Sequence, residues 1–452
     1  MTGIPLIIAF VVAVVLMIIA ISKWKVHPFL SIMGVSVLLA LVAGIPLTDV
    51  PGVIGAGFSG TFSSIGIVII LGALIGSILE QTGAALKLAD MVVKLVGKKN
   101  PELALELMGW VVSIPVFCDS GFVILDPIRK ALVKRTGSSS VAATVALSAG
   151  LYISHVFIPP TPGPIAAANT LGIGDNLLLV IGLGVLCSIF PLAAGLVYAK
   201  FIGKKVKSKD ELVEAGEVVK TYEELVAGYG KLPGGFNALA PIIVPVILMA
   251  LGTIGKQLGV TGFALNLLTF LGTPIISLAV GTIFAIAQLA IAKKMGEFYK
   301  ITNDTLKTVG PILFVTAAGG VLGKVISSTT MVAYITENAN FLMNLGIFFP
   351  FLLAAILKTA QGSSTVAITT TAGIVAPMMA QLGLATPVLA SLTVMAIGAG
   401  AMTVSHANDS YFWVVTNFGE MTPDQGYKTQ TILTLVMGIA SIIGIFLVSL
   451  FF

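Results

Sequence analysis

The chain has 452 residues, of which 57% are hydrophobic and only 10% charged, and its formal net charge is +5. Since a soluble domain carries about 25% charged residues, this composition excludes a soluble globular fold. The basic residues lie in loops, where they set membrane orientation, so nucleic acid is not an expected partner. Two cysteines provide neither a disulfide framework nor a metal motif, and we expect no cofactor.

Long apolar runs predict an all-α polytopic membrane protein. About 20 apolar residues span a bilayer as a helix, whereas a β-barrel would show short alternating segments. Continuous crossings are expected at 4–22, 26–44, 62–80, 177–199, 238–257, 263–292, 309–327 and 429–452, and interrupted ones at 140–172 and 385–418. Two further stretches, 103–135 and 344–383, do not fit a simple crossing.

Lysine and arginine residues orient these segments, because they favour the cytoplasmic side. Lys23 and Lys25 place the first loop in the cytoplasm, whereas the loop 45–61 has no Lys or Arg and is expected outside. Residues 103–135 lie between two basic, cytoplasmic segments and are too few for two full crossings. We therefore predict a re-entrant hairpin there, with its tip at residues 115–121.

Weak internal similarity indicates a duplication. GALIG at 72–76 matches GGVLG at 319–323, and Asp119 and His155 stand in step with Gly362 and His406. Five crossings in each half would invert the second half relative to the first. We predict an N-terminal repeat at 1–202, a cytoplasmic linker at 203–237 and an inverted repeat at 238–452. Each repeat has a re-entrant hairpin (103–135 and 344–383) and a broken span (140–172 and 385–418), a plan typical of secondary transporters.

Polar residues interrupt the apolar segments of the first half at two places. PVFCDSGF at 115–122 offers Asp119 and Ser120, and SHVFIPPTPGP at 154–164 offers His155 and Thr161 among prolines that no continuous helix survives. Polar groups at membrane depth usually mark a substrate or ion pathway. The plain alternatives are a helix cap for Asp119 and a helix end at the surface for the proline run.

The second half has two corresponding stretches. QGSSTVA at 361–367 places Ser363, Ser364 and Thr365 at a predicted helix start, where free amides and the helix dipole suit an anion. SHANDSYFW at 405–413 adds four more polar residues: His406, Asn408, Asp409 and Ser410. Asp119 and Asp409 are the candidate proton carriers, since intramembrane carboxylates often serve as proton relays. A plain cap and a cytoplasmic helix end are the alternatives here.

Together, PVFCDSGFVIL (115–125), HVFIPPTPGP (155–164), GSSTVA (362–367) and SHANDSYFW (405–413) resemble the GntP family of gluconate and sugar-acid permeases. The resemblance implies proton-coupled uptake of gluconate or a related acid across the bacterial inner membrane. It also implies kinship with the ion-transporter superfamily, a homodimer and an elevator-type movement. Arginine is scarce, with only Arg129 and Arg135 in the chain, so amide dipoles and hydroxyls are expected to hold the anion.

Other functions stay open at this point. The same fold would serve another small acid, such as glycerate or D-serine, or sodium coupling. A membrane hydrolase is disfavoured because the chain has no GxSxG elbow and no HExxH pair, and we do not expect an enzyme. A passive channel is disfavoured because channels are usually assembled by rotation around one pore.

Overall fold

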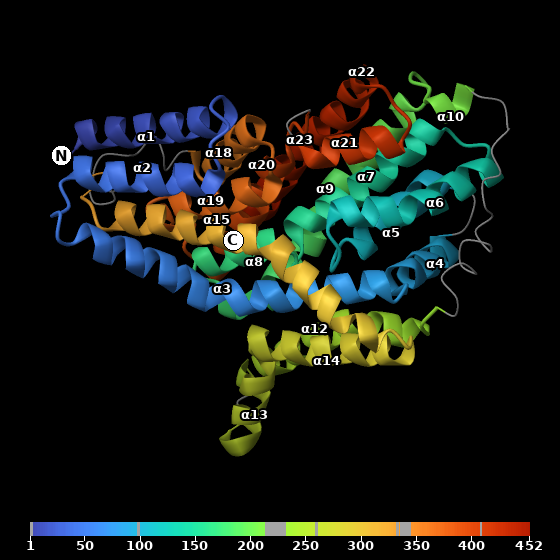
Figure 1. Cartoon of the computed structure of the whole chain (residues 1–452), viewed down its shortest axis with the longest axis horizontal. Coiled ribbons are helices and arrows are strands. Elements are labelled where there is room, and N and C mark those ends of the chain that lie inside the picture. The colour runs from blue at the N-terminus through green and yellow to red at the C-terminus, as the bar shows by residue number, and fades with distance from the viewer. Residues whose placement is uncertain are drawn as a thin grey trace.

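The computed structural model describes residues 3–96, 100–212, 232–257, 261–330, 334, 345–406 and 409–452. Within these ranges the regular elements are all helices, which agrees with the all-α prediction. Figure 1 shows them as an elongated bundle, with α1, α2 and α18 toward one end and α4 and α10 toward the other. Most of the expected linker, residues 213–231, lies outside the described residues.

The helices up to the linker are α1 (Ile4–Ser22), α2 (Pro28–Ala43), α3 (Val50–Gln81), α4 (Ala84–Val96), α5 (Pro101–Val112), α6 (Cys118–Thr136), α7 (Ser140–Phe157), α8 (Pro162–Thr170), α9 (Leu177–Ile202) and α10 (Lys209–Leu212). Those after it are α12 (Gly235–Gln257), α13 (Gly262–Gly272), α14 (Pro274–Ile291), α15 (Phe298–Ser327), α18 (Phe348–Gln361), α19 (Ser364–Val375), α20 (Pro387–Met402), α21 (Ser410–Phe418), α22 (Pro423–Gly426) and α23 (Ile432–Ser449).

Two of the predicted boundaries are wrong. The expected external loop 45–61 is helical from Val50, because Pro51 stands in the first turn, where its missing amide donor costs nothing, and apolar residues follow. The resulting α3 has 32 residues and a length of about 48 Å. The expected continuous span 263–292 divides at Thr273, which is followed by Pro274, into α13 and α14. Figure 1 shows α13 projecting away from the other helices.

In the described residues, six helices are long and apolar enough to cross a membrane, or seven if the pair Gly66–Gln81 and Ala84–Val92, bent by 78°, counts as one span. Several of the other expected crossings are shorter apolar helices of 10–17 residues, including Ile4–Met17, Pro28–Ala43 and Pro387–Met402. The structure is that of a multi-pass membrane protein. Ten crossings, the inverted repeat and the re-entrant course of the hairpins stay predictions.

Among the described residues, helix breaks occur at all four polar stretches, at residues 113–117, 158–161, 362–363, and 403–406 with 409. Local chemistry explains the ends. Gly362, with a φ of 90°, ends α18. The hydroxyl of Ser363 then accepts a hydrogen bond from the amide of Val366 and caps the start of α19. Asp409 caps α21 by accepting the amide of Tyr411. The prediction of a helix start at the QGSST stretch is confirmed.

The first break lies earlier than expected. Gly121 was expected in the turn, but it lies inside α6, where its amide donates to the carbonyl of Phe117. A Cβ at Gly121 would meet the side chain of Leu151 on α7 at 2.6 Å. This glycine therefore permits close helix packing, and Asp119 lies in the first turn of α6 rather than in a loop.

Helix packing is matched between the two halves. α14 packs on α3 as α2 packs on α15, and α3 and α15 lie against each other. In the same way α5 packs on α7 as α18 packs on α20, and α8 contacts α19 as α21 contacts α6. These last two contacts bring the polar breaks of the two halves together.

Candidate functional site

Three of the four helix breaks, those before α6, α19 and α21, border a cavity of about 440 Å³. Its walls come from the start of α2, the first turn of α6, α7, the middle of α15, and the breaks between α18 and α19 and between α20 and α21. The lining polar residues are His27, Asp119, His155, Thr308, Ser363, Ser364, Thr365, Asp409, Ser410 and Tyr411. The cavity therefore collects polar groups from both halves of an otherwise apolar molecule.

Asp119 is half-buried at the cavity wall. Its Oδ1 accepts a hydrogen bond from the hydroxyl of Ser410 at 3.2 Å, and its Oδ2 accepts a weak one from the thiol of Cys118 at 3.6 Å. Within the described ranges it makes no ion pair. Because Ser410 adjoins Asp409, this contact joins the carboxylate of the first half to the broken helix of the second.

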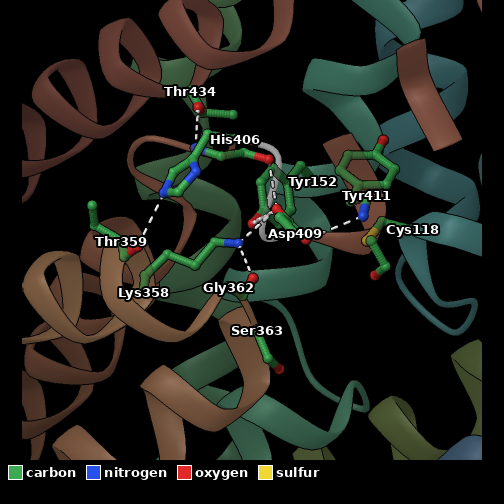
Figure 2. Close-up of polar contacts among 12 residues, drawn as sticks. Cys118, Tyr152, Lys358, Thr359, Gly362, Ser363, His406, Asp409, Tyr411 and Thr434 are labelled. Carbon is green, nitrogen blue, oxygen red and sulfur yellow. Dashed lines mark hydrogen bonds and ion pairs between the residues drawn. The ribbon is translucent and has the colours of Figure 1, made fainter. Parts of the chain in front are cut away.

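Asp409 is held far more tightly. The ammonium of Lys358 lies 2.6 Å from its Oδ2, and the two side chains are 0% and 6% exposed. The hydroxyl of Ser405 donates to the same oxygen at 2.5 Å, and that of Tyr152 does so at 3.4 Å. The backbone amide of Tyr411 donates to Oδ1 at 3.1 Å. Figure 2 shows Lys358 reaching Asp409 beside the Tyr152 ring. Both carboxylate oxygens therefore have donors.

Lys358 also ties two breaks together. Its ammonium donates to the carbonyl of Gly362 as well as to Asp409, so the start of α19 and the start of α21 share one cation. A buried charge is costly unless it is paired and hydrogen-bonded. Here the pairing meets that requirement.

His155 lies on α7 and is 5% exposed. Its Nδ1 has no hydrogen-bond partner among the described residues, and its ring lies 5.9 Å from that of Phe117, measured between centroids. It lines the cavity. Because most buried polar atoms in proteins have a partner, this nitrogen is a candidate contact for a ligand.

The predicted site residues divide into three groups. The cavity brings together Asp119, His155, Ser363, Ser364, Thr365, Asp409 and Ser410. Thr161 does not line it, because its hydroxyl donates to the carbonyl of Ile158 at 2.7 Å within the proline break, and neither does His406, whose Nε2 donates to the carbonyl of Thr359 at 3.0 Å. Asn408 and the side chain of Ser120 lie outside the described residues.

Sequence reasoning missed three residues of this site: Lys358, Tyr152 and His27. Lys358 carried a signal, since a lone cation inside an apolar helix needs a partner. His27 caps the start of α2 and lines the cavity, which nothing in its own segment indicated. Tyr152 carried no signal, because a tyrosine in an apolar helix is ordinary.

A second cavity of about 200 Å³ shares Phe117 and Thr308 with the first. Its lining includes four charged residues, Glu80, Glu297, Lys300 and Asp304. It lies between α3, α15 and the break before α6. Phe117 and Thr308 therefore lie where the main cavity and this charged cavity adjoin.

The main cavity suits a small polar anion. No Lys or Arg side chain is among its lining residues. The amides at the start of α19 and the hydroxyls beside them can accept a carboxylate, because a helix N-terminus favours negative charge. No group of His, Cys, Asp and Glu in the described part of the chain has the spacing of a metal site.

Apolar helices interrupted around a buried polar cavity define a multi-pass membrane transporter. The model of the GntP family permease matches residues 4–451, and the chain belongs to this family. It is 32% identical to the inner membrane permease YgbN of Escherichia coli, with 97% of each chain covered, and 30% identical to the low-affinity gluconate transporter of that organism, with 98% of each covered. The protein is an inner-membrane permease and not an enzyme.

Among solved structures, the chain is similar to the YdaH transporter of Alcanivorax borkumensis. The TM-score is 0.62 over 94% of this chain and 97% of that one, at 16% identity. At this identity the likeness concerns the fold alone. It places the helices of this permease in a transporter architecture.

Proposed function

We propose that the protein is a secondary active transporter that takes up gluconate or a related sugar acid together with protons. The observation that carries the proposal is the cavity, which joins hydroxyls, helix N-termini and one carboxylate without an ion partner. Its volume of about 440 Å³ falls within the range of about 300–1,000 Å³ that is common for small-molecule sites. The gluconate transporters among the relatives support the same substrate class.

A sugar acid matches the two kinds of group on the cavity wall. Its carboxylate would lie at the start of α19, near Ser363 and Ser364, which line the cavity, because a helix N-terminus favours negative charge. Its hydroxyls would pair with Thr365, Ser410 and the unpartnered Nδ1 of His155. Buried polar groups that expect a hydroxyl discriminate against ligands that lack one, so we expect a preference for polyhydroxy acids.

The matched packing of the two halves supports the proposed inverted repeats at 1–202 and 238–452, joined by the linker 203–237. The helices of the proposed scaffold, α3 and α15, meet the rest through backbone contacts at glycines. A Cβ at Gly76 would lie 2.0 Å from the carbonyl oxygen of Pro115, and one at Gly323 would lie 2.6 Å from that of Gly373. At these glycines the helices approach each other without a side chain between them, and we propose that the close backbone contacts are where an elevator movement occurs.

The homodimer is proposed from the family resemblance. Crosslinking in membranes and light scattering of the purified protein in detergent test it. A mass of one protomer in both measurements would contradict it.

Uptake by the purified protein in proteoliposomes tests the transport function. We expect labelled gluconate to accumulate when the outside is acidic and to equilibrate without accumulation when a protonophore is added. Unlabelled glycerate and D-serine, added as competitors, identify the preferred acid. Accumulation that needs sodium and ignores the proton gradient would replace proton coupling by sodium coupling.

A further inference from the structure

The two carboxylates that line the cavity have unlike surroundings. Asp409 has an ammonium, two hydroxyls and a backbone amide as donors. Asp119 has one hydroxyl and one thiol. Both were candidates for the coupled proton, and this difference separates them.

Asp409 is suited to remain ionised. A proton on its Oδ2 would have to displace the ammonium of Lys358, at 2.6 Å, and the hydroxyl of Ser405, at 2.5 Å. It would also leave a lysine that is 0% exposed without its anion. Since breaking a buried ion pair is strongly unfavourable, the pair keeps both charges.

Asp119 is suited to take up and release a proton. It faces the cavity and has no cation partner in the described residues. The other titratable groups on the same cavity wall are Cys118 on its own helix, Asp409 and Tyr411 from α21, His155 from α7 and His27 from α2. Asp409 is neutralised by Lys358, and the Nδ1 of His27 already accepts the amide of Phe29 at 3.2 Å.

We infer that Asp119 alone carries the coupled proton, while the Lys358–Asp409 pair stays charged and positions the starts of α19 and α21. The inference rests on the proposed function. Since the charges of Lys358 and Asp409 cancel, Asp119 is the one net charge among the described residues that line the cavity. An anionic substrate and an ionised Asp119 would repel each other in the same cavity, so each anion that binds brings one proton with it.

This assignment sets the stoichiometry. One proton with one monovalent anion carries no net charge through a transport cycle. Accumulation should therefore follow the pH difference and ignore the membrane potential. If Asp409 took a second proton, each cycle would carry one positive charge, and a potential of 100 mV would raise accumulation about fiftyfold.

The experiment compares the gluconate uptake of four proteins in proteoliposomes: wild type, Asp119→Asn, His155→Gln, and the double variant Lys358→Met with Asp409→Asn. Accumulation is measured at fixed pH difference with and without a potassium diffusion potential set by valinomycin. Exchange of labelled for unlabelled gluconate, at equal pH on both sides from 5 to 8, is measured in parallel. Wild-type accumulation driven by protons is the precondition, and its absence would refute the proposed function rather than this inference.

We expect wild-type accumulation to rise about tenfold per pH unit and to be unchanged by the potential. Asp119→Asn should lose accumulation but continue to exchange gluconate, with a rate that no longer depends on pH. The double variant should work more slowly and keep the wild-type pH profile. A His155→Gln variant should keep that profile too.

Other results would overturn the inference. They are proton-driven accumulation by Asp119→Asn, loss of the pH profile in the double variant or in His155→Gln, or a wild-type accumulation that rises with the potential. An Asp119→Asn protein that neither exchanges nor binds gluconate at any pH, while eluting from size exclusion like wild type, would also count against it. Such a result would make Asp119 a substrate ligand instead.

Discussion

Breaking the buried pair between Lys358 and Asp409 is the sharpest stability test of the site. Lys358→Met removes the ammonium but keeps an unbranched apolar side chain in its place. Asp409→Asn removes the partner charge and retains a side chain that can still cap α21. Each single variant leaves one buried charge behind, whereas the double variant leaves none.

The surroundings of the two side chains determine which single variant loses more free energy of unfolding. The paired side chains are 0% and 6% exposed, and removing one member of a buried pair costs about 3–5 kcal/mol. In Lys358→Met, Asp409 still has Ser405, Tyr152 and its capping amide, so we expect about 3 kcal/mol. In Asp409→Asn, Lys358 retains the carbonyl of Gly362, and we expect a loss nearer 5 kcal/mol.

The double variant should be more stable than either single one, with a loss of about 1–2 kcal/mol, because neutral residues of similar size remove the desolvation penalty along with the attraction. Unfolding of the purified protein in detergent, followed by intrinsic fluorescence against denaturant, measures the four stabilities. With these losses, the interaction energy from the cycle should reach about 6–7 kcal/mol.

An exposed pair on α15 is the matched control. Lys307 lies 3.4 Å from Asp304, with side chains 70% and 53% exposed, and the same cycle there should give less than about 1 kcal/mol. The reasoning is refuted if the losses of Lys358→Met and Asp409→Asn simply add, or if the two cycles give equal interaction energies.

Three further outcomes follow from other contacts. Gly323→Ala should slow transport at least tenfold, because the new Cβ would lie 2.6 Å from the carbonyl oxygen of Gly373. Gly310→Ala on the same helix meets nothing within 4 Å and should transport normally. Equal rates for the two variants in the uptake assay would contradict a movement at the contact between α15 and α19. Ser363→Ala and Thr386→Ala each remove a helix cap at a cost of about 1 kcal/mol, and binding titrations should show weaker gluconate affinity only for Ser363→Ala. Arg129→Lys should lower the stability by about 2–4 kcal/mol without changing affinity, since the buried guanidinium bonds Asp126, Ser140 and the carbonyl of Phe418 at once; unchanged denaturant midpoints would argue against this role.

Local chemistry made much of the site predictable from the sequence. Polar residues inside apolar stretches are rare because they are costly in a membrane, so Asp119, Ser363 and Asp409 were visible without a structure. The helix start at Ser363 followed from its hydroxyl and the glycine before it. Features that depend on neighbouring residues alone were therefore within reach.

Features that depend on contacts between segments far apart in the sequence could not be predicted. Lys358 and Asp409 are 51 residues apart, and neither local sequence indicates that the two side chains are in contact. His27 lines the cavity because α2 packs on α15, a contact with no local signature. Gly121 was misplaced for a similar reason, since the space it leaves is filled by Leu151 of another helix.

The number of proton carriers sets how far this permease can concentrate its substrate. With Asp119 as the one carrier, the limiting ratio of inside to outside anion equals the proton ratio, about tenfold per pH unit. A second carrier would add the membrane potential, worth about 2.3 kcal/mol per charge at 100 mV. On the inferred assignment, the pairing of Asp409 with Lys358 gives up that gain, and it holds the starts of α19 and α21 in place beside the cavity. A permease with Asp119 as its one proton carrier would therefore take up its substrate in proportion to the proton ratio across the membrane, at any membrane potential.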